Sequence, residues 1–438
     1  MIFKIAVRNS IKNWRHSLSA LLSLSASFVS LVIFDGYIDD VNKMYLENYS
    51  RRQMLGDLIV ENVNYNSDIG KIDPWAYSLT DEDQNSINDL AKNNFPEIKT
   101  MVKNLNFKGI VTNGQQTQIF IGRGIDLKEG ALLRGSKWAW NINNGKPLDY
   151  FQNENVLALG MGLSEKLNCH WDKSQKVLAF YGDVQPIERP FDCLTKDLQL
   201  STTTSEGQLN AIDLQVGALI NAGYKDIDNR YIQTSLNIAQ TLTDTTKVSF
   251  ISIDIGDKSK TKKVRDQLNQ YFKLNRPHLR AIQWQDHPMG EMYLKTIDFL
   301  EIFRNFMILV LFFVSTLSVV NTMIKIVKER TKEIGAMRSF GFLKNKIIQL
   351  FVVESICLSV IGTLFGIFFS LGITLMLNIS GITYNAGVLS EPIYFKISFL
   401  PFAYLSAFLL LIFVSIVSTL IATRQTVRGE IVENLNYV

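Results

Sequence analysis

The residues best suited to metal or redox chemistry are few. They are the four histidines and three cysteines His16, His170, His278, His287, Cys169, Cys193 and Cys357. No H-E-x-x-H spacing of a zinc protease occurs among them. Cys169, His170 and Cys193 could supply three ligands, but a structural zinc site uses four. The sequence favours a disulfide between Cys169 and Cys193 instead, because their segment is predicted below to face an oxidising compartment.

Nucleotide and hydrolase chemistry also have no recognisable residues here. The glycine-rich motif G-x-x-x-x-G-K-[ST], whose backbone cradles nucleotide phosphates, is missing from the sequence. No Ser/His/Asp grouping can be identified from spacing. We therefore predict that the chain is not an enzyme and carries neither a metal nor a cofactor.

The composition indicates a membrane protein with a large water-exposed part. Hydrophobic residues make up 47% and charged residues 20% of the 438 residues. The net charge is only +4, and the basic residues gather beside apolar runs. Such residues orient a chain in a membrane, so we predict contact with membrane lipids and no binding of nucleic acid.

The most distinctive segment is the charged insert at residues 325–347. It has seven lysines or arginines against two glutamates, as a positive-inside loop would. Val327, Ile334 and Met337 recur at helical spacing, so one apolar stripe is predicted to face the membrane or a partner. Gly341 stands where a helix C-cap glycine is expected.

The insert also carries a family signature. The matching residues are Glu329, Arg330, Glu333, Ile334, Gly335, Arg338, Gly341 and Ile347. They resemble the pattern ERT-EIG-(L/M)R-(A/S)-G-----I of the permease family that includes MacB, the LolC/LolE lipoprotein extractors and FtsX. The resemblance implies that residues 329–341 are a coupling helix, which docks into a cytoplasmic ABC ATPase. The opening residues are similar to the family's start at Ala6, Val7, Arg8, Asn9 and Arg15.

Four apolar stretches are long enough to cross a bilayer core of about 30 Å at 1.5 Å per residue. They are residues 17–37, 296–324 (the span itself from 305), 348–377 and 398–422. A cleavable signal peptide would have a shorter apolar region and a small-residue cleavage site, so the first is predicted to be an uncleaved helix.

The charges beside these stretches predict the topology. Basic residues place 1–16, 325–347 and 423–438 in the cytoplasm, with both chain termini. Residues 38–295 and the link 378–397 then lie outside. Helical spacing continues from residue 37 to about 49 and begins again near 289, which predicts a stalk at each end of the outer segment.

The third span carries two features of its own. Gly362 and Gly366 form a small-xxx-small face, where another helix can pack closely. Glu354 has two interpretations, a proton or substrate relay or a partner for a nearby basic residue. The second is favoured, because the family that the chain resembles often has Glu here and is powered by ATP.

The outer segment reads as an α+β domain. The predicted elements are strands at 58–63, 100–111, 116–125, 248–255 and 279–284, a helix from 80 with a capping box, and a helix from about 259 to 272. Ser259 is the candidate N-cap of that last helix. This is strand-helix-strand twice, a split βαβ arrangement, interrupted by a second lobe at about 127–245.

Two stretches of the second lobe also resemble the family. Residues 156–167, and 214–223 followed by 231–242, are similar to segments of the MacB-type periplasmic core. The resemblance thus implies a membrane protein with four transmembrane helices and a MacB-type periplasmic domain between helices 1 and 2.

The function implied by this resemblance is that of a permease subunit. It would sit in a bacterial inner membrane and use mechanotransmission to move a lipoprotein, peptide or amphiphile on the periplasmic side. Because 16 residues precede the first span, we expect ATP and Mg²⁺ on a separate ATPase dimer. The other expected partners are a second permease, identical or different, and a periplasmic adaptor or carrier.

The alternative is an FtsX-like signalling subunit that activates a cell-wall hydrolase without transport. The size of the outer segment discriminates between the two. FtsX-type outer domains are small, whereas residues 38–295 with a second lobe fit the MacB and Lol plan. Residues 183–192 contain proline and arginine like a carrier-binding loop, but their position does not match the Lol pattern.

Overall fold

The computed structural model describes residues 14–136, 142–151, 155–173, 188–385, 389–390 and 392–427. It divides the chain into two compact units. The helical unit comprises Met1–Asn42, Thr296–Ile382 and Phe395–Val438. The sheet unit comprises Lys43–Lys295 and Thr383–Tyr394. Each unit has its own hydrophobic core and is described by itself.

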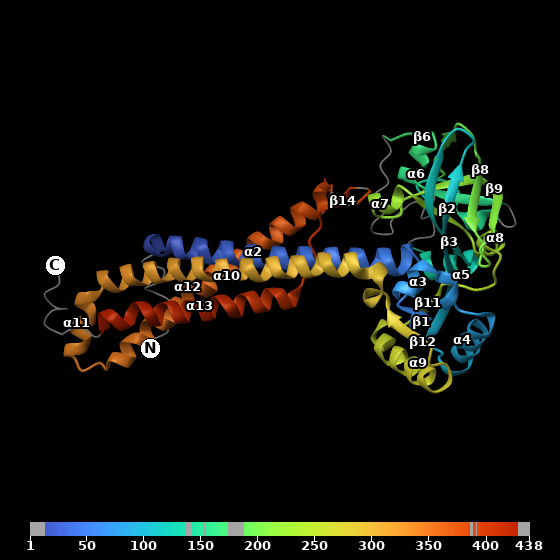
Figure 1. Cartoon of the computed structure of the whole chain (residues 1–438). Coiled ribbons are helices and arrows are strands. Elements are labelled where there is room, and N and C mark those ends of the chain that lie inside the picture. Colours follow the sequence, from blue (N-terminus) through green and yellow to red (C-terminus); the bar gives the residue numbers. More distant parts are fainter. Residues whose placement is uncertain are drawn as a thin grey trace. The chain divides into compact units, whose positions relative to one another are not determined.

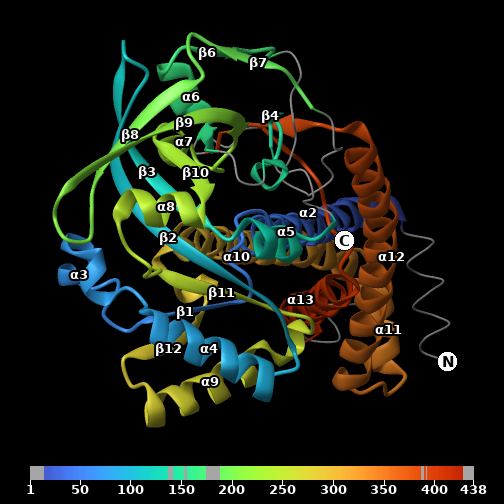
Figure 2. The ribbon, with the colours of Figure 1, turned by 90° about the vertical axis from the view of Figure 1, so that its right-hand side faces the viewer.

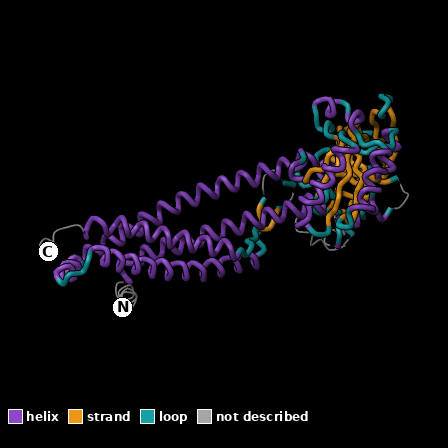
Figure 3. Tube along the Cα trace, turned by 90° about the horizontal axis from the view of Figure 1, so that it is seen from below, coloured by secondary structure: helices purple, strands orange, loops and turns teal. Residues whose placement is uncertain are grey.

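Among the described residues, five helices make up or enter the helical unit (Figure 3). They are α2 (Trp14–Glu47), α10 (Glu291–Glu329), α11 (Thr331–Ser339), α12 (Lys344–Ser380) and α13 (Pro401–Val427). Four of them, all but α11, are long and apolar enough to cross a membrane. The prediction of four such helices is confirmed. Each runs past its apolar stretch, because the backbone hydrogen bonds of a helix continue through polar residues.

Small and hydroxyl side chains bring these helices close together. A Cβ added at Gly366 of α12 would stand 2.8 Å from the Cβ of Phe28 on α2. At Gly362 it would stand 3.1 Å from the Cβ of Leu24. The hydroxyls of Ser27 on α2 and Ser315 on α10 are 2.7 Å apart. Close backbone approach and interhelical hydrogen bonds are the main attractions between helices in lipid.

The sheet unit contains the predicted split βαβ arrangement. Its elements are β1 (Leu58–Asn62), α4 (Asp81–Asn94), β2 (Ile98–Thr112), β3 (Thr117–Ile125), β11 (Phe250–Ile255), α9 (Thr261–Asn275) and β12 (Leu279–Gln283). The strand order β12-β1-β11-β2 has antiparallel neighbours throughout. Helices α4 and α9 cover one face (Figure 2), and their apolar side chains share a core with the strands.

Local capping signals explain how these two helices begin. The Thr80 hydroxyl accepts a hydrogen bond from the Asp83 N–H while the Asp83 carboxylate accepts one from the Thr80 N–H, so the predicted capping box is confirmed. The predicted Ser259 N-cap is wrong. Ser259 lies in a 3-10 turn capped by Asp257, and α9 starts only at Thr261. Asp257 forms the cap instead, because its carboxylate accepts the Ser259 N–H at 3.0 Å.

Residues 127–245 extend the same sheet. Their elements are α5 (Leu127–Arg134), β4 (Asn144–Gly145), β5 (Val156–Gly160), α6 (Met161–Lys166), β6 (Cys169–Trp171), β7 (Phe191–Cys193), β8 (Asp197–Thr203), β9 (Leu209–Ile220), α7 (Lys225–Asp228), β10 (Tyr231–Ser235) and α8 (Leu236–Thr243). The order continues β2-β3-β10-β5-β9-β4, and β8 pairs with β2 and β9. Phe107 of β2 and Phe120 of β3 lie in one core with Leu159 and Leu200. The segment therefore builds its core on strands that precede it in sequence.

The predicted outer link 378–397 also contributes to the sheet unit. Its middle forms the hairpin β13 (Thr383–Tyr384) and β14 (Ile393–Tyr394). Leu389 is buried and forms an isolated bridge with Tyr224. The Ser390 N–H donates to the Gly223 carbonyl at 3.2 Å. This link therefore packs onto the loop between β9 and β10.

Some sequence-based expectations lie outside the described residues. They concern the opening residues 1–13, the proline-containing stretch 183–187 and the tail from 428. The predictions about the basic start, the carrier-loop composition and the cytoplasmic tail therefore stay predictions.

A buried ionic network holds β1 to β12 and to the turn that follows it. Glu61 is fully buried and accepts hydrogen bonds from Arg280 at 2.6 Å, Asn66 at 2.8 Å and His287 at 3.2 Å. Burial alone would raise the pKa of Glu61, but the bonds to His287 and Arg280 outweigh it and hold that pKa below its ordinary value. The network therefore stabilises the fold above the ordinary pKa of about 4.3 and loses this contribution as the pH falls through the lowered pKa.

We expect Glu61→Gln to lower the free energy of unfolding by about 3 kcal/mol at neutral pH, because it leaves buried donors without a charged acceptor. Urea unfolding of the solubilised full chain measures this. Glu82→Gln is the matched control, since the Glu82–Arg276 pair is exposed and solvent screens its attraction. Equal losses in the two variants would contradict the assignment, as would an unchanged acid dependence in Glu61→Gln.

The structure joins Cys169 of β6 and Cys193 of β7 in a disulfide, where the two residues face each other across the strand pair. Both are buried. Closing a separation of 24 residues is worth about 3 kcal/mol in the chain-entropy estimate. We expect non-reducing peptide mapping of the native protein to recover the linked peptides. Recovery of both cysteines as free thiols would show that the native protein does not form this disulfide.

Candidate coupling site

The predicted coupling residues occupy one elbow between two long helices. In the helical unit, α11 joins α10 to α12 at one end (Figure 1). Glu329 ends α10, Arg330 lies in the break with φ −106° and ψ 16°, and Thr331 starts α11. The other predicted residues are Glu333, Ile334, Gly335 and Arg338 on α11 and Gly341 just after it.

Arg330 ties the three helices of this elbow together. Its guanidinium binds Glu333 on α11 through Nε at 2.7 Å and Glu354 on α12 through Nη1 at 3.1 Å. It also lies over the Phe351 ring, 5.5 Å from the centroid. Glu354 has a side-chain exposure of only 2%, so removing it would leave a charge without its buried partner. The favoured interpretation of Glu354, pairing with a basic neighbour, agrees with this contact.

The predicted apolar stripe packs against other residues of the chain. Val327 and Ile334 are fully buried, and they pack with Met337, Ile347 and Phe351. The prediction that this stripe faces the membrane or a partner is therefore wrong. Helical spacing shows that residues share a face, but α12 folds back over this one and covers it.

The end of α11 is a Schellman motif. The Gly341 N–H donates to the Arg338 carbonyl at 3.0 Å, and the Phe342 N–H donates to the Met337 carbonyl at 3.1 Å. Gly341 has φ +86°, a conformation that glycine adopts without strain. The predicted C-cap role of Gly341 is confirmed.

This cap turns three apolar side chains outward. Phe340 is 84%, Phe342 55% and Leu343 70% exposed, and the lysines Lys344 and Lys346 beside them are exposed too. We name Phe340, Phe342 and Leu343 the apolar tip. The tip was not among the predicted features, although three apolar residues around the cap glycine of a charged insert are a signal for it in the sequence.

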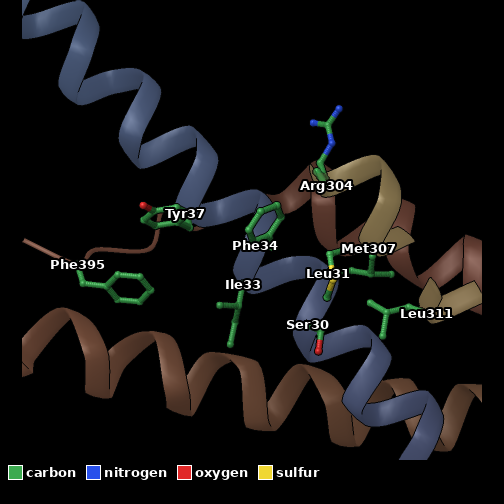
Figure 4. Close-up of a pocket in the computed structure, with 9 residues that line it drawn as sticks. All are labelled: Ser30, Leu31, Ile33, Phe34, Tyr37, Arg304, Met307, Leu311 and Phe395. Carbon is green, nitrogen blue, oxygen red and sulfur yellow. The ribbon is translucent and has the colours of Figure 1, made fainter. Parts of the chain in front are cut away.

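A separate feature of the helical unit is a cavity of about 320 Å³ between α2 and α10 (Figure 4). Its lining is mostly apolar and consists of Ser30, Leu31, Ile33, Phe34, Tyr37, Arg304, Met307, Leu311 and Phe395. In Figure 4 the Arg304 side chain extends away from the apolar side chains, and its guanidinium lies 3.9 Å from Asp35. The cavity is therefore suited to an alkyl chain with a polar group at one edge.

Parts of the chain are similar to known proteins. Residues 305–431 match the family model described as FtsX-like permease C-terminal. The chain is 22% identical over 371 residues to the macrolide export ATP-binding/permease protein MacB of Mannheimia succiniciproducens, covering 81% of this chain and 50% of that protein. It is 34% identical over 67 residues to the ABC transporter permease YtrF of Bacillus subtilis, covering 15% of each.

Two solved structures are also similar. The extracellular domain of the ABC-type transporter YknZ from Gram-positive bacteria has a TM-score of 0.32 at 14% identity, covering 52% of this chain and 100% of that one. The periplasmic region of MacB from Actinobacillus actinomycetemcomitans has a TM-score of 0.33 at 12% identity, covering 56% and 92%. The chain spans half the length of the MacB relative named above. Residues 305–431 thus match the model of an FtsX-like permease C-terminal domain, and the chain, which has four helices long and apolar enough to cross a membrane, is similar in part to the MacB and YtrF permeases.

Proposed function

We propose that the chain is the permease subunit of an ATP-driven ABC complex. It works by mechanotransmission to move a lipoprotein, peptide or amphiphile on the outer side of a bacterial inner membrane. Both termini lie in the cytoplasm, where a separate ATPase dimer binds ATP and Mg²⁺. A second permease completes the complex, and a periplasmic adaptor or carrier receives the cargo.

The apolar tip is the observation that carries this proposal. Three large apolar side chains are exposed at one turn, among lysines, at the end of a helix whose other face is buried. Burying such side chains gains roughly 1.5–3 kcal/mol each. A tip of this kind fits a cleft on a partner that has apolar walls and acidic edges.

The Arg330 contacts support transmission of force from that tip. A push on α11 acts on Arg330 and, through its bond to buried Glu354, on α12. Because α10 ends at Glu329, the same push also acts on the end of that helix. The elbow can therefore pass a movement of the ATPase to two transmembrane helices at once.

The cavity between α2 and α10 supports an amphiphilic cargo. An apolar lining of this size accommodates part of an acyl chain, while Arg304 at its edge offers a charge to a polar head. Measuring cargo movement in reconstituted membranes, as described below, distinguishes transport from the signalling alternative.

The test is co-purification of an ATPase with the full chain. We expect the triple variant Phe340→Ser, Phe342→Ser, Leu343→Ser to weaken ATPase binding at least about 100-fold, because the tip's apolar contacts are lost. Ile69→Ser with Ile72→Ser is the control, since these side chains are equally apolar and exposed but lie on the sheet unit. Mass spectrometry of the gently solubilised complex identifies the bound subunits.

Undiminished ATPase yield in the triple variant would refute the coupling assignment. Reversing the charges of Glu333 and Arg338 is a second route, and it should weaken docking by removing complementary pairs. This double reversal does not test docking alone, because reversal at Glu333 also breaks its 2.7 Å hydrogen bond to Arg330 inside the elbow. If the ATPase binds but no cargo moves in reconstituted membranes, the signalling alternative replaces transport.

A further inference from the structure

The sheet unit contains a small polar cavity that the proposed transport mechanism does not use. Its volume is about 220 Å³, roughly the space of seven water molecules at about 30 Å³ each. It is lined by Ser50 near the end of α2, Asp57 before β1, Lys258 and Lys262 around the start of α9, and Gln285 after β12. Four separate parts of the chain thus contribute polar groups to one space.

Two of these groups have no partner in the described structure. Ser50 is 1% exposed, and its Oγ forms no hydrogen bond with the described residues. The buried Oε1 of Gln285 lacks a partner there as well. Leaving a buried polar atom without a hydrogen bond is unfavourable, and native proteins satisfy nearly all such atoms. A hydrogen-bonding occupant would remove this cost.

The two lysines in the lining indicate that part of the occupant is negatively charged. Lys258 and Lys262 are both exposed at the cavity, and within the described residues no carboxylate lies within the 4.0 Å of an ion pair from either ammonium group. They lie at the N-terminal end of α9, whose first turn has no side-chain cap. Helix N-termini and lysines both favour an anion, and phosphate above all.

The hydrogen-bond acceptors in the lining, Asp57 and Gln285, indicate that the occupant also carries donor groups. Asp57 is buried, and its Oδ2 already accepts the Ile255 N–H at 2.9 Å. An ionised carboxylate and an amide oxygen can only accept hydrogen bonds. A bare anion such as sulfate would therefore leave Asp57 and Gln285 facing another acceptor. Hydroxyl groups on the occupant would satisfy both.

We propose that this cavity binds a phosphate group bearing a short polyol, with the phosphate held by Lys258, Lys262 and the Ser50 hydroxyl, and the polyol hydroxyls donating to Asp57 and Gln285. The ligand is either a free glycerol phosphate or the phosphoglycerol headgroup of a lipid. Both sources present the same chemistry to the cavity. The inference does not depend on the transport function.

The experiment is calorimetric titration of the solubilised full chain with sn-glycerol 3-phosphate. We expect Lys258→Gln with Lys262→Gln to weaken binding about 100-fold, or roughly tenfold for each charge-assisted bond. Ser50→Ala should weaken it about tenfold. Lys263→Gln is the control, because Lys263 is exposed on the same helix but does not line the cavity. Thermal unfolding of each variant shows that the fold is intact.

Titrations with different ligands distinguish free glycerol phosphate from the lipid headgroup. Short-chain phosphatidylglycerol that binds while short-chain phosphatidylcholine does not identifies the headgroup, whereas binding of glycerol 3-phosphate alone identifies the free ligand. Equal affinity for sulfate, or equal affinity of the double lysine variant and the Lys263→Gln control, overturns the proposal. So does the absence of binding by glycerol 3-phosphate and by phosphatidylglycerol alike.

Discussion

Replacing Ile297 and Leu300 of α10 by glycine is expected to abolish cargo movement while the partner ATPase continues to hydrolyse ATP. The helix runs without a break from Glu291 to Glu329, about 58 Å at 1.5 Å per residue. Each glycine costs about 1 kcal/mol of helix propensity and removes a packing side chain. A helix loosened at two positions one turn apart would bend under load instead of transmitting it.

Expression-matched wild-type and variant complexes are compared in reconstituted membranes, and cargo moved is divided by ATP hydrolysed. The control is Ile297→Ala with Leu300→Ala, which also truncates both side chains but keeps a good helix former at each position. The alanine pair should retain most of the output. If α10 is a passive tether, the glycine pair will move as much cargo per ATP as wild type, and the mechanotransmission proposal fails.

Gly366→Leu is expected to disrupt the packing of α2 on α12. The added Cβ would stand 2.8 Å from the Phe28 Cβ, closer than real side chains approach. The rest of the leucine must then push the helices apart, and overpacking of this kind typically costs 1–3 kcal/mol or more. We expect a lower unfolding temperature of the solubilised protein and a lower yield.

The chain offers a matched control for this substitution. Gly372 lies on the same helix, and a Cβ placed there meets nothing within 4 Å. Gly372→Leu should therefore unfold at nearly the wild-type temperature. Should the two leucine variants be indistinguishable, the close approach at Gly366 does not contribute to stability.

Local signals were enough to predict much of this architecture. The four long helices follow from apolar stretches that exceed the bilayer thickness. The Thr80 capping box and the Gly341 cap depend on residues only a few positions apart. The split βαβ order follows from two strand-helix-strand patterns, because such crossovers have few allowed topologies.

The wrong prediction for the apolar stripe came from interactions between residues distant in sequence. The stripe of Val327 and Ile334 is amphipathic whether a partner or the chain itself covers it, and only the fold-back of α12 decides which. Residues 127–245 were predicted as a second lobe, and sequence patterns indicate strands there without indicating which strands neighbour them. Their pairing with β2 and β3 is a matter of register in space.

The candidate sites divide in the same way. The sequence by itself determined the membrane helices, the charged insert and its cap, since each depends on spacing within one element. Only the tertiary structure decided that Arg330 binds Glu354 across 24 positions, that the apolar tip is exposed, and that Ser50, Asp57, Lys258 and Gln285 line one cavity. The physical reason is that periodicity and capping are properties of neighbouring residues, whereas partner choice and burial depend on which distant surfaces meet when the chain folds.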